Sequence, residues 1–173
     1  AYLKTQFSKQ PHIGIILGTG LGGLVNEIKI EKSLPYEQIP HFPVSTVEGH
    51  QGRLIIGTID GVPVLAMQGR FHFYEGYDMK AVTFPVRVMK AVGIKNLLVS
   101  NAAGGMHPDF EIGDLMIITD HINLFPEHPL RGKNYEELGP RFPDMSEAYC
   151  KDFIAKAKQI AERNHIKVVE GVY

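Results

Sequence analysis

The chain has 173 residues, with 18 Lys and Arg against 19 Asp and Glu, and 44% of its residues are hydrophobic. This balance is typical of a globular protein and excludes a disordered, collagen-like or coiled-coil chain. Because the formal net charge is −1, no basic surface predicts a nucleic acid or an anionic membrane as partner. We expect a single domain over residues 1–173.

Cysteine content and one apolar segment bear on location. Cys150 is the only cysteine, so no disulfide forms within the chain, which favours a reducing compartment. We expect Cys150 to pack as a small apolar side chain. The uncharged stretch 13–25 holds five glycines, which suits a turn better than a signal-peptide helix, and it is too short to span a bilayer. We therefore expect a cytoplasmic protein with no membrane partner.

The first part of the chain predicts strands. His12 to Leu17 is rich in β-branched residues and ends in a glycine cluster, as a strand before a turn does. Two further strands, 53–59 and 62–68, flank Asp60-Gly61, which is a strong two-residue hairpin signal. The segment 35–43 begins and ends with proline and is expected to be an irregular loop.

The middle of the chain predicts one helix and two strands. Residues 79–92 carry apolar side chains at helical spacing, with Gly93 as the stop and a kink at Pro85. The helix face is expected to consist of Ala81, Phe84, Val88, Met89 and Val92. Segments 95–100 and 115–119 are apolar and are expected to be buried strands.

The last part predicts a long loop, a helix and a strand. Segment 125–143 contains four prolines and is expected to be an irregular functional loop. Asp144 and Glu147 are spaced as a capping box for a helix whose inner face would consist of Tyr149, Phe153, Ala157 and Ile160. Strand character returns at 166–173. Strands that alternate with helices, plus one hairpin, predict an α/β fold with a mixed β-sheet flanked by helices.

The glycine cluster after the first strand contains Gly18-x-Gly20-x-x-Gly23. Glycines let backbone amides approach an anion closely, and a following helix would point its N-terminus at a phosphate. A dinucleotide site would also need a second strand ending in an acidic residue about 20 positions on, and segment 35–43 does not provide one. Phosphate binding and a purely structural turn therefore both remain open, and the Thr19 hydroxyl is the candidate phosphate donor.

Segment 69–77 gathers charged, imidazole and phenol side chains within nine residues after a predicted strand. Arg70 offers a planar fork that suits a phosphate dianion. His72 and Tyr74 would project to the same side because they lie two positions apart. The alternative is an aromatic cluster that caps a sheet, with Arg70 and Glu75 as a structural ion pair.

Two other segments are weaker candidates when taken alone. His50 lies between glycines in a predicted loop, where it is either a hydrogen-bonding group or solvated surface. Segment 101–105 follows a predicted strand with small residues, so a flat ligand or an anion could reach its amides, or it is only a tight turn. The histidines show no metal-ligand spacing, and no Gly-x-Ser-x-Gly elbow is present, so we expect neither a metal nor a serine hydrolase.

Seven motifs occur together and in order along most of the chain, and together they are far more specific than any one of them. They are Gly18-Thr19-Gly20-Leu21-Gly22-Gly23, Gly49-His50-Gln51-Gly52-Arg53, the segment 67–77, Thr83-Phe84-Pro85-Val86-Arg87, Asn101-Ala102-Ala103-Gly104-Gly105, Asp120-His121-Ile122-Asn123-Leu124 and Arg141-Phe142-Pro143-Asp144-Met145-Ser146. In these motifs the sequence resembles the trimeric class of purine nucleoside phosphorylases.

The resemblance implies reversible phosphorolysis of purine ribonucleosides and deoxyribonucleosides, with inorganic phosphate as co-substrate, no cofactor and a homotrimeric assembly. It places phosphate against six residues and gives His50, Arg70 and His72 catalytic roles. The implied phosphate contacts are Thr19, His50, Arg70, His72, the backbone of Phe71 and the main-chain amide of Ala102, with Glu75 orienting the site from behind. Thr19 stands where the family usually has serine, and the hydroxyl is kept.

The resemblance also implies sugar and base contacts. His72 and Tyr74 would lie on the ribose, and Phe142 would reach into the site of a neighbouring subunit. One wall of the base pocket would consist of Ala102, Ala103 and Gly104.

Family chains continue well beyond Tyr173, and the later part carries the carboxylate and amide that grip the purine, together with a further phosphate hydroxyl. We therefore expect a fold that is incomplete on its C-terminal side. The alternatives are a methylthioadenosine phosphorylase, which the polar His72 opposes, and a non-catalytic fragment that binds phosphate or nucleoside.

Overall fold

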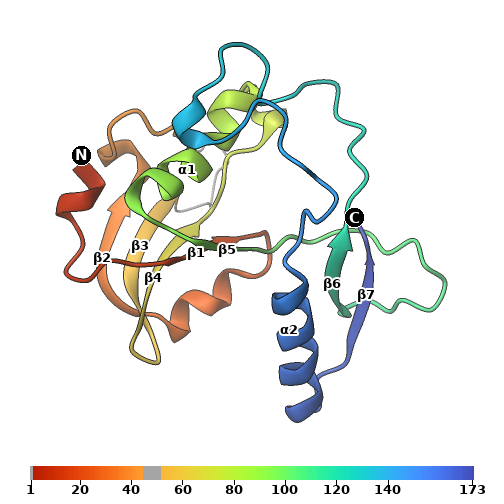
Figure 1. The fold of residues 1–173 in the computed structure, drawn as a ribbon. Coiled ribbons are helices and arrows are strands. Elements are labelled where there is room, and N and C mark those ends of the chain that lie inside the picture. Colours follow the sequence, from red (N-terminus) through yellow and green to blue (C-terminus); the bar gives the residue numbers. More distant parts are fainter. Residues whose placement is uncertain (1, 45–51) are drawn as a thin grey trace. The chain divides into compact units, whose positions relative to one another are not determined.

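The main sheet has five strands in the order β2-β3-β4-β1-β5 (Figure 1). The computed structural model describes residues 2–44 and 52–173. The bounds of these strands are β1 Ile13–Leu17, β2 Lys29–Pro35, β3 Arg53–Ile59, β4 Val62–Gln68 and β5 Asn96–Val99. Strand β1 is parallel to both β4 and β5, whereas β3 is antiparallel to β2 and β4. The predicted mixed α/β sheet is therefore confirmed.

The hairpin β3–β4 forms where the sequence predicts it. Asp60 and Gly61 have φ values of 48° and 79°, and left-handed conformations at both central positions are what a tight two-residue hairpin needs. Arg53 pairs with Gln68 at the open end and Ile59 with Val62 beside the turn. The turn therefore sets the register of the central pair of strands.

Helix α1, Met79–Val92, also matches its predicted bounds. The Asp78 carboxylate accepts a hydrogen bond from the Ala81 amide at 2.7 Å, and Gly93 ends the helix at φ 103°. Its buried residues are Pro85, Met89 and Val92. Since these positions follow helical spacing, one face of α1 packs on the sheet.

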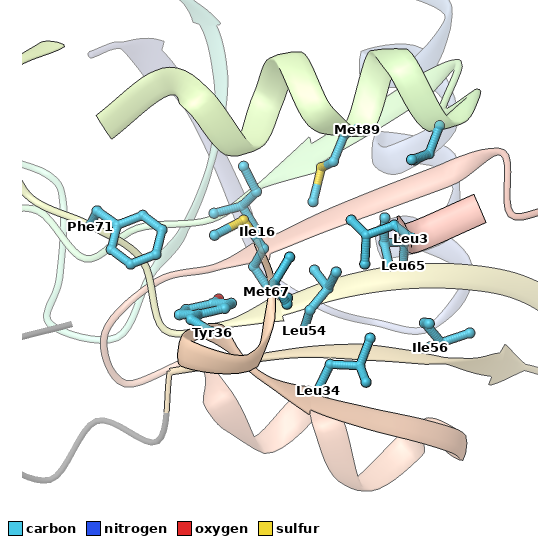
Figure 2. Close-up of a cluster of buried hydrophobic side chains, with 12 residues drawn as sticks. Leu3, Ile16, Leu34, Tyr36, Leu54, Ile56, Leu65, Met67, Phe71 and Met89 are labelled. Carbon is cyan, nitrogen blue, oxygen red and sulfur yellow. The ribbon is translucent and has the colours of Figure 1, made fainter. Parts of the chain in front are cut away.

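Buried side chains lie on both faces of the sheet, because successive strand residues point to opposite sides. The larger cluster comprises Leu3, Ile16, Leu34, Tyr36, Ile39, Leu54, Ile56, Leu65, Met67, Phe71, Met89 and Val92. Figure 2 shows Met89 reaching from α1 toward the side chains of this face. The opposite face buries Ile15, Leu17, Val25, Ile28, Ile55, Val64 and Ala66.

The chain divides into two compact units, which are described separately. The first comprises residues 1–102 and 129–131, and the second comprises 103–128 and 132–173. In the second unit, β6 (Leu115–Asp120) pairs in parallel with β7 (Val168–Val172), and α2 (Lys151–Arg163) precedes β7. Five short 3-10 helices lie in the described ranges, at Tyr2–Thr5, Gly22–Glu27, Tyr36–Gln38, Phe73–Glu75 and Glu136–Leu138.

The first unit departs from the sequence predictions in two places. Strand β2 was not predicted, and the segment 35–43, which was expected to be an irregular loop, begins with the last residue of β2 and a short 3-10 helix. The expected burial of β5 is also wrong, because all four of its residues are exposed. Among the described residues, strand β5 pairs with β1 alone and forms an edge of the five-stranded sheet.

Four predictions about the second unit are wrong. Asp144 does not cap a helix with Glu147; its carboxylate accepts from the amide and hydroxyl of Ser146, and α2 begins only at Lys151. Phe153 and Ile160 are 38% and 57% exposed, and the buried residue of α2 is Ala161. Strand β6 is only half-buried, and Cys150 is exposed rather than packed.

Candidate functional site

Three adjacent parallel strands end at the same edge of the sheet. Leu17 of β1 pairs with Gln68 of β4, and Ile16 of β1 pairs with Val99 of β5. The turns that leave these strands therefore begin side by side, at Gly18, Gly69 and Ser100. Ligands of α/β proteins gather at such carboxyl ends. We call Gly18, Thr19, Gly69, Arg70, His72 and Ser100 the strand-end site.

Ser100 joins two of these turns. Its hydroxyl oxygen accepts a hydrogen bond from the Gly18 amide at 3.1 Å, and its carbonyl oxygen accepts one from Arg70 Nη1 at 3.2 Å. A Cβ atom at Gly18 would lie 2.3 Å from that same carbonyl oxygen. Only glycine therefore lets β1 end this close to Ser100, and the turns that carry Thr19 and Arg70 meet there.

Arg70, His72 and Glu75 form a chain of hydrogen bonds. Arg70 Nε donates to His72 Nε2 at 3.2 Å, and His72 Nδ1 lies 2.7 Å from Glu75 Oε1. Because a guanidinium only donates, Nε2 accepts and the ring proton sits on Nδ1, facing the carboxylate. The same Glu75 oxygen accepts from the His72 amide at 2.9 Å. Glu75 thus fixes His72, and His72 fixes one side of the guanidinium.

A buried tyrosine holds the peptide before Arg70. Gly69 has φ 87°, and its carbonyl accepts a hydrogen bond from the Tyr36 hydroxyl at 2.7 Å. Tyr36 is fully buried and packs its ring 5.0 Å from that of Phe71. Burial raises the pKa of Tyr36 well above its ordinary value, so the phenol keeps its proton and remains a donor.

The phosphate candidates have distinct surroundings in the structure. Thr19 is exposed in the turn after β1, whereas Phe71 is only 3% exposed and joins the aromatic cluster of Tyr36, Phe42 and Tyr77. The side chain of Phe71 therefore points into the core, and only its backbone is left to face a ligand. His50 lies outside the described residues. The expected helix after the glycine cluster is a 3-10 helix, Gly22–Glu27.

The sugar and base candidates are mostly exposed. The Tyr74 side chain is 75% exposed, and its ring stacks on that of His72 with centroids 4.8 Å apart. Ala102 is exposed at the end of the first unit. In the second unit, Ala103 and Gly104 are exposed, and Phe142 is 86% exposed with the Arg141 guanidinium 5.8 Å from its ring centre.

The second unit has a cavity of about 300 Å³ beside the end of β6 and the start of α2. Lys151 and Lys158, two of its lining residues, are paired with Glu147 at 2.5 Å and Glu170 at 2.6 Å. None of the residues that the sequence singles out for phosphate, sugar or base lines this cavity. The strand-end site is therefore the stronger candidate.

Neither Ser100 nor Tyr36 is among the sequence-predicted site residues. A polar residue that ends the apolar run Leu97-Leu98-Val99 is the one signal that could have singled out Ser100. Tyr36 has no comparable signal, because its partner Gly69 lies 33 positions away. Within residues 2–44 and 52–173, no three His, Cys, Asp or Glu side chains gather as a metal site requires. No helix in this part of the chain has the length and apolarity needed to cross a membrane.

The chain is similar to known purine nucleoside phosphorylases in sequence and structure. It is 58% identical over 173 residues to purine nucleoside phosphorylase 1 of Bacillus subtilis (strain 168), covering all of this chain and 64% of that protein. A crystal structure of a purine nucleoside phosphorylase with ribose-1-phosphate superposes with a TM-score of 0.93 at 47% identity, covering 99% of this chain and 65% of that one. The Schistosoma mansoni enzyme with inosine gives 0.92 at 45% identity, with coverage of 99% and 62%.

The chain spans slightly less than two thirds of the length of these relatives. The model of the Phosphorylase superfamily matches residues 12–173, which is almost the whole sequence. This match includes every turn of the strand-end site. The chain belongs to the Phosphorylase superfamily.

Proposed function

We propose that this chain carries the phosphate-binding part of a purine nucleoside phosphorylase, which cleaves purine ribonucleosides and deoxyribonucleosides reversibly with inorganic phosphate. The proposal is supported by the family, by the names of the relatives and by the ligands in the titles of the matching structures. The products are the free base and pentose 1-phosphate.

One observation carries the proposal: the meeting of the turns after β1, β4 and β5 around a guanidinium. The bonds from Arg70 to Ser100 and His72 use two of the five N–H groups of an arginine. They hold the planar fork in place beside the turn of Thr19. An anchored fork suits a phosphate dianion, which takes paired, charge-assisted hydrogen bonds.

In the proposed site, phosphate is bound by Thr19, His50 and Arg70, together with the amide of Ala102 and the backbone of Phe71. His72 orients Arg70 through Nε2, and Glu75 holds the imidazole from its other side. Contact of His72 Nε2 with phosphate or with the 5′-hydroxyl would replace its bond to Arg70 Nε, while the Ser100 carbonyl still holds Nη1 of the guanidinium. Phosphate binding and sugar binding are therefore coupled through one hydrogen bond.

The chemistry that this arrangement supports is electrostatic. Breaking the glycosidic bond develops positive charge on the sugar, and a clamped dianion near the anomeric carbon stabilises that charge before its oxygen forms the new bond. The electron pair of the broken bond leaves with the base. Positioning is sufficient for this reaction, so the proposal includes no cofactor and no metal.

The remaining roles belong to the same proposal. Tyr74 contacts the ribose, and Ala102, Ala103 and Gly104 form one wall of the base pocket. The strong exposure of Phe142 suits a side chain that reaches the site of a neighbouring subunit in a homotrimer. A cytoplasmic location stays a prediction from the sequence.

The test is inosine cleavage with and without inorganic phosphate, with hypoxanthine and ribose 1-phosphate quantified by chromatography. We expect base release only with phosphate, and equal amounts of the two products. Release without phosphate would indicate a hydrolase and contradict the proposal. Phosphate binding without cleavage would favour the non-catalytic fragment, and faster cleavage of methylthioadenosine than of inosine would favour the other phosphorylase.

A further inference from the structure

We propose that Ser100 is a positioning residue of the phosphate site: its hydroxyl sets the turn that carries Thr19 while its carbonyl holds Arg70. The inference rests on the proposed function and goes beyond it, because Ser100 itself contacts no substrate in this scheme. It concerns how two phosphate-binding groups from separate strands are kept at one spacing.

Ser100 forms hydrogen bonds with the residues at the end of β1. Its amide donates to the Ile16 carbonyl at 3.0 Å, which continues the pairing of β1 with β5. Its hydroxyl donates to the same carbonyl at 3.4 Å and accepts from the Gly18 amide at 3.1 Å. One side chain therefore bridges the residues on either side of Leu17, the last residue of β1.

The same residue also fixes Arg70. The Ser100 carbonyl accepts from Nη1 at 3.2 Å, while His72 holds Nε of the same guanidinium at 3.2 Å. A shift of the Ser100 peptide would therefore move the Gly18–Thr19 turn and the guanidinium together. The close approach of Gly18 to the Ser100 carbonyl, where a Cβ would lie 2.3 Å away, leaves this junction little freedom to adjust.

Replacing a serine that has only a structural role would have different effects. Loss of a structural hydrogen bond lowers stability and weakens every ligand alike. Loss of a positioning bond shifts Thr19 relative to Arg70, so it weakens phosphate binding and spares nucleoside binding. Retention of a hydroxyl by threonine should preserve the phosphate affinity, because threonine offers the same donor and acceptor.

The experiment compares Ser100→Ala and the matched pair Ser100→Thr and Ser100→Val in the full 173-residue chain. The control is Ser33→Ala, the same change in the exposed edge strand β2. Calorimetry measures the affinity for inorganic phosphate and, separately, for inosine, and circular dichroism measures Tm. If Ser100→Ala does not fold, the comparison of Ser100→Thr with Ser100→Val still tests the inference.

We expect Ser100→Ala and Ser100→Val to bind phosphate about fivefold more weakly, as for the loss of one hydrogen bond. Inosine affinity should stay within about twofold, and Ser100→Thr and Ser33→Ala should match the wild type. Equal phosphate affinity in all variants, equal losses for both ligands, or no rescue by threonine would overturn the inference and leave the proposed function standing. Failure of the wild-type chain to bind phosphate would overturn both.

Discussion

The two units of the chain differ in what holds them together. Of the buried apolar residues in the described part of the chain, those of both sheet faces lie in the first unit, and Ala161 alone lies in the second. The second unit instead shows ion pairs at its surface, including Lys167 with Glu111 at 2.7 Å and with Asp114 at 2.9 Å. Such exposed pairs contribute little to stability compared with apolar burial.

The difference bears on function. Gly18 and Arg70 lie in the turns that directly follow the core strands β1 and β4, whereas Met106, Ile112 and Leu124 of the second unit are almost fully exposed. Residues that must hold a dianion at fixed spacing need a rigid support, and the first unit provides one.

The substitution with the largest expected effect disrupts the strand-end site without changing the core. Arg70→Ala removes the fork and should weaken phosphate binding about a hundredfold or more, because hydrogen bonds to charged groups are the strong ones. Inosine affinity should change less than about threefold. Calorimetry checks both, with Arg163→Ala at the end of α2 as a control that keeps wild-type affinities. Equal losses for the two ligands would contradict the role of Arg70.

The next prediction compares the two units directly. Leu65→Ala leaves a cavity at a fully buried position and should lower the free energy of unfolding of the first unit by about 3 kcal/mol. Ile160→Ala changes a side chain that is 57% exposed and should cost no more than about 0.5 kcal/mol. Urea unfolding with segment-resolved amide exchange measures both. Similar costs at the two positions would show that the difference in burial does not decide stability.

Tyr36→Phe tests one hydrogen bond of the first unit, because it removes the hydroxyl and keeps the aromatic packing. The Gly69 carbonyl loses its donor at 2.7 Å, which should cost about 1 kcal/mol of unfolding free energy. Thermal and urea unfolding measure this cost. The control is Phe42→Leu. It disturbs the packing of the Phe42 ring against the Tyr36 ring, whose centroids lie 5.6 Å apart, without removing a hydrogen bond. A wild-type amide exchange rate at Arg70 in Tyr36→Phe would argue against a role in holding that peptide.

The smallest expected effect is the pH response of the second unit. The Glu111 amide and the Lys167 ammonium lower the pKa of Asp114, and Glu111 and Asp114 raise the pKa of Lys167. The Asp114 contribution is present above its ordinary pKa near 4 and is lost as pH falls through the lowered value. The Lys167 contribution is present below its ordinary pKa near 10 and is lost as pH rises through the raised value.

Amide exchange of β6 and β7, corrected for intrinsic rates, should therefore accelerate toward both extremes of pH. Asp114→Asn should remove the acceleration of exchange in β6 and β7 at low pH. It should leave the exchange rates of β3 and β4 unchanged. The same acid response in Asp114→Asn as in the wild type would show that another carboxylate controls the opening.

Local signals explain which elements could be predicted. The hairpin turn Asp60-Gly61 and the helix stop at Gly93 act through their own backbone conformations, so β3, β4 and α1 were predicted with their observed bounds. Strand β2 was missed because it is an edge strand whose first five residues are exposed, so its sequence carries little apolar alternation. At Asp144 a turn with Ser146 has the spacing of a helix cap, and only the fold distinguishes the two.

The candidate site was predictable to a similar degree. Residue type and motif indicated Thr19, Arg70 and Glu75, because glycine-rich turns and guanidinium groups carry a known chemistry. The contact of Gly18 with Ser100 joins residues 82 positions apart, and the bond from Tyr36 to Gly69 joins residues 33 apart. Such contacts depend on strand order, which the pattern along the chain does not specify.

A two-dimensional amide NMR titration of the chain with inorganic phosphate tests most directly whether the turns after β1, β4 and β5 form one phosphate site. Chloride at matched ionic strength is the reference. We expect the amide resonances of Gly18 to Gly20, of Gly69 and Arg70, of Ala102 and of His50 to shift together with one Kd. Shifts confined to one of these turns, or different affinities at different turns, would contradict a single phosphate site at the ends of β1, β4 and β5.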